Sequence, residues 1–167
     1  MEAIPYISPE KLKELTANRK QEFLALFKKL KKKKPKNLDD VVQELHYEAF
    51  QQFDCLDCAN CCSSISPMVT DKDVERLARH LKMKAVDFID QYLYRDEDND
   101  YVFKETPCPF LLPDRYCAVY EQRPKACREY PHTDRKRFVQ ILNLTHKNCE
   151  ICPVVYCITG ELAKKEW

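Results

Sequence analysis

The chain has 167 residues, a formal net charge of +1 at pH 7 and a single glycine. A molecule this close to neutral has no large field to attract nucleic acid or an acidic surface. One glycine also excludes phosphate-binding loops and dinucleotide-binding fingerprints, which need several positions without a Cβ.

Two helices are predicted before residue 53. Ser8-Pro9 supplies a capping side chain followed by proline at the first helical position, and apolar residues then recur at helical spacing as far as Pro35. A second helix is predicted over residues 38–53, and the two helices should form a hairpin. We interpret residues 1–53 as a helical arm that packs on the core.

Seven lysines lie between Lys28 and Lys36 of this arm. A lysine run at a helix end complements the negative end of the helix dipole and keeps the arm soluble. No aromatic residue interleaves with the lysines to stack on bases, so nucleic acid is disfavoured as a partner. A protein partner, if there is one, is expected to bind through the arm.

Four further helices are predicted after the arm. Apolar residues at spacings of three and four mark the first of them after Thr70, whose side chain suits an N-cap. The same periodicity predicts the others at residues 85–93, 135–144 and 154–165. We interpret residues 54–167 as a cysteine-rich metal-binding domain.

Two short segments rich in β-branched and aromatic residues predict strands, Tyr101–Lys104 and Arg115–Tyr120. We expect them to pair as a small ribbon. The expected fold class is therefore mainly α with a small β-ribbon, with an irregular cysteine-rich core that is stabilised by metal and preceded by the helical hairpin arm.

Four cysteines fall within eight residues in the segment Cys55-Leu-Asp-Cys58-Ala-Asn-Cys61-Cys62. A Cys-x-x-Cys step lets two sulfurs face one ion while backbone N–H groups of the turn point toward the thiolates. Neighbouring cysteines such as Cys61 and Cys62 send their side chains in different directions and seldom bind one ion together. The pair therefore indicates two metal ions or one polynuclear cluster.

All ten cysteines are candidate metal ligands. One tetrahedral site consumes four thiolates and leaves six, so at least two metal ions are expected. Disulfides are disfavoured because Met1–Ile7 lacks the features of a secretory signal, which indicates a cytoplasmic protein with reduced thiols. Cys157 has an alternative interpretation as a small buried side chain. The candidate ligands are Cys55, Cys58, Cys61, Cys62, Cys108, Cys117, Cys127, Cys149, Cys152 and Cys157.

The identity of the metal is open between zinc and iron. Zinc accepts any arrangement that supplies four tetrahedral thiolates, so it is the less demanding assignment. Cys-x2-Cys-x2-Cys followed by a distant Cys-Pro is part of the bacterial ferredoxin pattern, but Ile65 stands where the next cysteine of that pattern would be. An iron–sulfur cluster therefore stays open as well.

Thiolates around a divalent ion carry net negative charge, which is costly to bury without cations nearby. Arg123 and Arg128 are the candidates for this cofactor-binding role, and His132 is a candidate substitute ligand. No Ser/His/Asp set or pair of carboxylates stands out, so no catalytic residue is assigned and the question of enzymatic activity stays open.

Three segments, Cys55–Cys62, Cys108–Leu111 and Cys117–Pro131, together resemble the CxxCxxCC family, also called the YkgJ-type cysteine cluster family, a zinc- or iron-chelating domain. Seven cysteines match its pattern, and the last three follow the matched region. The resemblance implies metal binding without a settled reaction. Flagellin lysine methylases carry a related cysteine arrangement, but this chain has no glycine-rich loop for S-adenosylmethionine.

The sequence thus predicts a protein that holds zinc or iron through clustered thiolates. Two alternatives stay open: an iron–sulfur redox or protein-modifying enzyme, and a metal donor or scaffold. No uninterrupted apolar run approaches the roughly 18 residues of a membrane span, so no membrane partner is expected.

Overall fold

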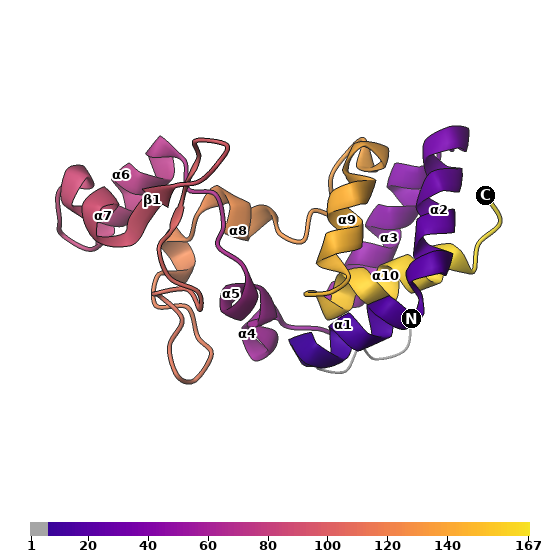
Figure 1. Ribbon diagram of the computed structural model, residues 1–167, viewed down its shortest axis with the longest axis horizontal. Helices are drawn as coiled ribbons and strands as arrows, with labels where there is room; N and C mark the ends of the chain where they lie inside the picture. The colour runs from indigo at the N-terminus through magenta and orange to yellow at the C-terminus, as the bar shows by residue number, and fades with distance from the viewer. Residues whose placement is uncertain (1–6) are drawn as a thin grey trace. The chain divides into compact units, whose positions relative to one another are not determined.

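The computed structural model describes residues 7–167 and is shown in Figure 1. Helices make up 58% of it and the β-structure is one two-stranded ribbon, so the expected mainly α class is confirmed. Contacts divide the described residues into two compact units. We call residues 7–55 with 131–167 the helical unit, and Leu56–Tyr130 the cysteine unit. The predicted division into an arm over 1–53 and a domain over 54–167 stays a prediction. The contacts instead group residues 131–167 with the amino-terminal helices.

The helical unit is built around its last helix, α10, which contacts α1, α2, α3 and α9. Most residues of α10 are buried, because its sequence is apolar on nearly every side. The unit contains α1 (Pro9–Asn18), α2 (Lys20–Lys33), α3 (Leu38–Phe50), the 3₁₀ helix η2 (Phe138–Ile141), α9 (Leu142–Asn148) and α10 (Pro153–Ala163).

The amino-terminal helix predicted to run to Pro35 is two helices that meet at Arg19, whose backbone is not helical (φ −104°, ψ 9°). The predicted start is confirmed, since the Ser8 side chain accepts a hydrogen bond from the backbone N–H of Lys11. Arg19 donates two hydrogen bonds, of 2.8 and 2.7 Å, to the carboxylate of Glu22 and so fixes the first turn of α2.

The two amino-terminal helices were expected to pack on one another as a hairpin. Instead, α2 and α3 each contact α10 more extensively than they contact one another. The closing helix predicted over 135–144 is also displaced, since the chain forms η2 and then α9. Asp39 of α3 accepts the backbone N–H groups of Arg137 and Phe138, which fixes the entry to η2. Buried apolar side chains from all of these elements form the core: Leu12, Phe23, Leu26, Phe27, Leu30, Leu38, Val42, Leu45, Ala49, Phe138, Leu142, Val154, Val155, Ile158 and Leu162.

The cysteine unit has shorter elements joined by longer irregular segments. Its predicted helix after Thr70 is confirmed with a capping box, in which Thr70 and Asp73 bond to one another's backbone N–H groups. The elements are α4 (Cys55–Cys58), α5 (Asn60–Ser64), α6 (Asp71–His80), α7 (Ala85–Tyr92), β1 (Leu93–Arg95), β2 (Tyr101–Phe103), η1 (Tyr120–Gln122) and α8 (Lys125–Glu129).

The ribbon is present, but the partner predicted for its strand was wrong. β2 pairs antiparallel with β1, with Tyr94 opposite Val102, and not with Arg115–Tyr120. The latter segment forms a turn, in which Cys117 makes an isolated bridge with Leu111. The polar turn at residues 96–100 connects β1 directly to β2, and a short connection is the cheaper way to close a hairpin.

A small apolar cluster holds α6, α7 and the ribbon together, and aromatic rings contribute much of it. Phe110 contacts Phe88, Tyr92 and Phe103, with ring centroids 5.1 to 6.4 Å apart. Cys108 and Cys117 pack against this cluster from its edge. No helix within residues 7–167 is both long and apolar enough to cross a bilayer.

Candidate metal centre

The clustered cysteines begin on two very short helices that turn sharply at Ala59. Ala59 has a left-handed backbone (φ 52°), unusual for a residue with a Cβ. Its carbonyl accepts both the backbone N–H and the hydroxyl of Ser63. This turn places Cys58 on α4 and Cys61 and Cys62 on α5 within one compact segment.

The Cys108 segment lies directly beside this turn, because the backbone N–H of Cys108 donates to the Cys62 carbonyl over 2.8 Å. Cys117 is brought back to Cys108 by the Leu111 bridge and by a bond from the N–H of Ala118 to the carbonyl of Phe110. Three separate stretches of chain thus carry cysteines into one region.

Cys62 acts electrostatically on the other cysteines of this region. Its sulfur lies 4.0 Å from that of Cys61, and the hydrogen bond from Cys61 lowers the pKa of Cys62 to about 7 despite burial. Burial is the main cause that raises the pKa of four other thiols, and negative charge on Cys62 adds to it in each of them. These four are Cys58, Cys108, Cys117 and Cys127.

Cys108, Cys117 and Cys127 also act on one another. After burial and Cys62, the charges of Cys108 and Cys117 help raise the pKa of Cys127 to about 12, and Cys117 helps raise that of Cys108 to about 11. Mutual repulsion of this kind falls off with distance, so the three thiols lie in the same region of the unit. A bound cation is the partner that would let several of them ionise together.

Backbone N–H groups are aimed at three of these sulfurs. In each case the donor lies two residues after the cysteine, and its hydrogen bond lowers the pKa of the thiol against the effect of burial. The N–H of Asn60 donates to Cys58, that of Phe110 to Cys108 and that of Val119 to Cys117. Such donors stabilise thiolates without adding a charge. The turns are therefore already shaped to support ionised sulfur.

The donor set suits zinc or iron, since it consists of soft thiols without carboxylates. Within residues 7–167 no three His, Cys, Asp or Glu side chains converge closely enough to hold an ion as they stand. The cysteines therefore fit zinc or iron in their donor chemistry and in the closeness of the segments that carry them. Ligation requires the cysteine side chains to rotate toward a common point.

Of the two arginines predicted to balance the thiolates, Arg123 lies near Cys117 and Cys127, because its charge lowers the pKa of both against burial. Its guanidinium stacks 3.8 Å from the centre of the Tyr120 ring and donates to the Tyr120 carbonyl. Arg128 donates instead to the carbonyl of Arg123 over 2.9 Å, so it supports the segment that carries Arg123.

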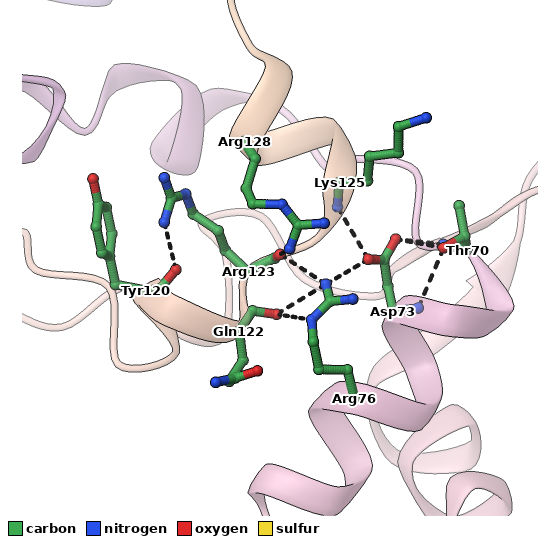
Figure 2. A network of polar contacts seen from close by, with 8 residues as sticks. All are labelled: Thr70, Asp73, Arg76, Tyr120, Gln122, Arg123, Lys125 and Arg128. Atoms are coloured by element: carbon green, nitrogen blue, oxygen red, sulfur yellow. Dashed lines mark hydrogen bonds and ion pairs between the residues drawn. The ribbon is translucent and has the colours of Figure 1, made fainter.

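A buried carboxylate anchors this segment to α6, as Figure 2 shows. Asp73 is 1% exposed, and its carboxylate accepts a hydrogen bond from the backbone N–H of Lys125 over 3.1 Å. The same carboxylate forms an ion pair of 2.5 Å with Arg76. Arg76 also donates to the carbonyls of Gln122 and Arg123. The sequence predicted a helix cap at Thr70 but gave no sign of this role of Asp73.

Arg115 is a further cation that sequence reasoning missed. It is placed by a turn with a left-handed backbone (φ 70°), and its charge lowers the pKa of Cys58 against burial. Its guanidinium donates to the Asp57 carbonyl. The only available signal was the turn sequence Pro113-Asp114-Arg115, which does not reveal its three-dimensional neighbours.

The remaining candidates belong to other surroundings. Cys55 is exposed at the start of α4. Cys149 is fully buried in the helical unit, 3.3 Å from the Thr159 hydroxyl, and burial raises its pKa to about 12. Cys152 caps α10, and burial raises the pKa of Cys157 within it. His132 lies in the helical unit with a left-handed backbone (φ 67°).

One family model matches the chain, over residues 54–153, and is described as CxxCxxCC, putative zinc- or iron-chelating domain. No curated protein and no solved structure gave a match. The matched residues contain nine of the ten cysteines, all except Cys157. Because the match covers more than half of the chain, this protein belongs to the CxxCxxCC family.

Proposed function

We propose that this protein holds at least two ions of zinc or iron through cysteine thiolates of the cysteine unit. Membership of a zinc- or iron-chelating family supports metal binding in general. The observation that supports the finer proposal is that Cys62 lies beside Cys61 and in a segment bonded to that of Cys108, and that its charge raises the pKa of Cys58, Cys108, Cys117 and Cys127.

The proposed ligands form two sets that share Cys62. Cys108, Cys117 and Cys127 would complete four thiolates around one ion with Cys62. Cys58 and Cys61 would bind a second ion together with Cys62, and Cys55, on the same short helix as Cys58, is a further candidate ligand. A Cys62 thiolate that bridges the two ions would let both members of the vicinal pair serve in one site with two ions.

When bound, such ions would neutralise the thiolates and cross-link segments that have few other contacts. The chain itself supplies the backbone N–H donors toward Cys58, Cys108 and Cys117, which stabilise ionised sulfur. Arg123 and Arg115 supply positive charge beside the two sets of thiols. These groups reduce the cost of burying a negatively charged site.

The test is elemental analysis and a visible spectrum of protein purified without oxygen. We expect two or more ions per chain, with iron–sulfur distinguished from zinc by absorbance at roughly 400 nm. A ratio of one ion per chain or less, in material that is folded by circular dichroism, would overturn the proposal.

Serine variants test the shared ligand. Cys62→Ser should lose both ions, whereas Cys58→Ser should lose one and keep the other. Cys157→Ser is the matched control and should keep both, because that sulfur lies in α10 of the helical unit. Full metal content in Cys62→Ser would contradict a shared thiolate, and loss in Cys149→Ser, Cys152→Ser or Cys157→Ser would extend the ligand set to the helical unit.

A further inference from the structure

The end of α2 presents a dense group of positive charges on a rigid support. Seven lysines fall between Lys28 and Lys36, and each is exposed. The opposite side of the helix is anchored in the core by Phe23, Leu26 and Leu30. The charges therefore project from a packed helix and the turn that follows it, and not from an unstructured tail.

These lysines are not neutralised by the protein itself. Within residues 7–167 no ion pair joins any of the seven to an Asp or Glu side chain, and Lys33 donates to the main-chain oxygen of Trp167 over 2.5 Å. Two of the nearby carboxylates are engaged elsewhere, since Glu22 binds Arg19 and Asp39 accepts backbone N–H groups of Arg137 and Phe138. Asp40 is exposed on α3 and forms no ion pair with the seven lysines. A helix dipole can offset only the charges of the last turn.

A second helix extends the charged surface. The Phe27 ring contacts the His146 ring, and Lys31 donates to the Asn143 side chain over 2.7 Å. These two contacts place α9 beside α2 in antiparallel direction, so Lys147, one turn after Asn143, lies on the same outer side. We call Lys28, Lys29, Lys31, Lys32, Lys33, Lys34, Lys36 and Lys147 the basic face.

The neutral charge of the whole chain conceals this asymmetry. The sequence assigned to the helical unit, including its first six residues, has 17 basic and 13 acidic residues, a net charge of +4. The cysteine unit has 11 basic and 14 acidic residues, a net charge of −3, and the two values give the overall +1. A field that is weak at long range can therefore be strong beside the basic face.

The composition of the basic face distinguishes among anionic partners. Every cation is lysine, a hydrated point charge without the fork of arginine, and no aromatic side chain lies among them to stack on bases. Two leucines are exposed instead, Leu24 one turn before Lys28 and Leu144 next to Asn143. Nucleic acid offers these leucines no apolar surface, whereas a phospholipid boundary does.

We propose that the basic face binds the surface of a membrane rich in anionic phospholipid, with Leu24 and Leu144 against the headgroup and acyl boundary. The expectation of no membrane partner rested on the missing spanning segment, and an electrostatic surface contact needs none. This contact is independent of the metal centre, whose ligands lie in the cysteine unit.

Co-sedimentation of the metal-loaded full chain with vesicles tests the proposal. We expect binding to phosphatidylcholine vesicles that contain about 30% phosphatidylglycerol and little binding to pure phosphatidylcholine. Raising the salt concentration from about 0.05 to 0.5 M should release the protein, because exposed charges are then screened. Equal binding to both kinds of vesicle would overturn the proposal.

A charge-neutralising variant makes the test specific. Lys28→Gln, Lys29→Gln, Lys32→Gln and Lys36→Gln together should weaken binding several hundred-fold, at about fivefold for each lysine. The matched control replaces Lys13, Lys20, Lys72 and Lys84 by glutamine and has the same net charge, and it should bind far more tightly than the first variant. Equal affinities of the two variants would show that net charge alone matters and would overturn the proposal that the basic face is the binding surface.

Three further measurements complete the design. Leu24→Ser should weaken binding by about three- to tenfold through lost apolar contact while its salt dependence is unchanged. Both lysine variants should keep the metal content and far-UV spectrum of the parent chain, which separates this proposal from that of the metal centre. Tighter binding to single-stranded RNA than to anionic vesicles at the same salt concentration would assign the basic face to nucleic acid and overturn the membrane proposal.

Discussion

The two units of this protein are stabilised by different means. The helical unit buries large side chains from six elements around α10, including Phe23, Phe138 and Ile158 at 0% exposure. The cysteine unit has a smaller apolar cluster around Phe88 and Phe110, and its cysteines lie on turns at the edge of that cluster. The comparison teaches that a large hydrophobic core organises one part of the chain, while the other part has a small apolar cluster, polar contacts and thiols that a metal could cross-link.

The largest expected effect separates the units by metal removal. Chelation under anaerobic conditions should speed hydrogen exchange in residues 56–130 on the order of tenfold or more, including at the N–H of Cys108, because the irregular segments lose their cross-links. Exchange in α10 should change little. Peptide-resolved mass spectrometry measures both, and uniform acceleration over the whole chain would contradict the comparison.

The reverse experiment weakens the helical unit alone. Phe23→Ala should cost about 3–5 kcal/mol of unfolding free energy, because the ring is fully buried against Tyr156. Metal content should be unchanged in the folded protein. Leu24→Ala is the control, since that side chain is 42% exposed and should cost below about 1 kcal/mol in denaturant titration.

A polar substitution sharpens the comparison within the cysteine unit. Asp73→Asn should cost about 2–3 kcal/mol, because it removes a buried charge that binds Arg76 and the backbone N–H of Lys125. Metal affinity should fall with it, since the Arg123 segment loses its anchor. Asp71→Asn, on the exposed side of the same helix turn, is the control and should be neutral in both measurements.

A smaller effect concerns pH in the helical unit. Burial lowers the pKa of His46 below its ordinary value of 6.5, with partial opposition from Asp134. The unfolded chain therefore binds a proton first, so stability present above pH 6.5 is lost as the pH falls through the folded pKa. Thermal unfolding of the parent chain and of His46→Gln between pH 7 and 5 should differ by this loss, and identical pH profiles would contradict it.

The smallest expected effect tests how closely α1 and α10 are fitted. A Cβ on Gly160 would lie 2.8 Å from Nη1 of Arg19, whereas alanine gains about 1 kcal/mol of helix propensity. Gly160→Ala alone should thus change stability by less than about 0.5 kcal/mol. In an Arg19→Ala background the same change should stabilise by about 1 kcal/mol, and a double-mutant cycle of calorimetric scans measures the difference.

Local signals in the sequence predicted the elements well but their partners poorly. The Ser8 and Thr70 caps were correct because a capping side chain acts within three residues of itself. The strand at Tyr101–Phe103 was also correct, whereas its partner was wrong because pairing depends on which connection closes at lower cost. The break at Arg19 carried no recognisable signal, since neither proline nor glycine occurs there.

The same distinction holds for the metal centre. Cysteine spacing by itself determined the thiol chemistry, the vicinal pair at Cys61 and Cys62 and the family, because these properties belong to residues close in sequence or to an ordered pattern. Only the tertiary structure decided that the charge of Cys62 acts on the other thiols, that Arg115 acts on Cys58, that Asp73 holds the Lys125 segment and that residues 131–167 join the amino-terminal helices. Long-range contacts are selected by packing and charge over the whole chain, and no local pattern encodes them.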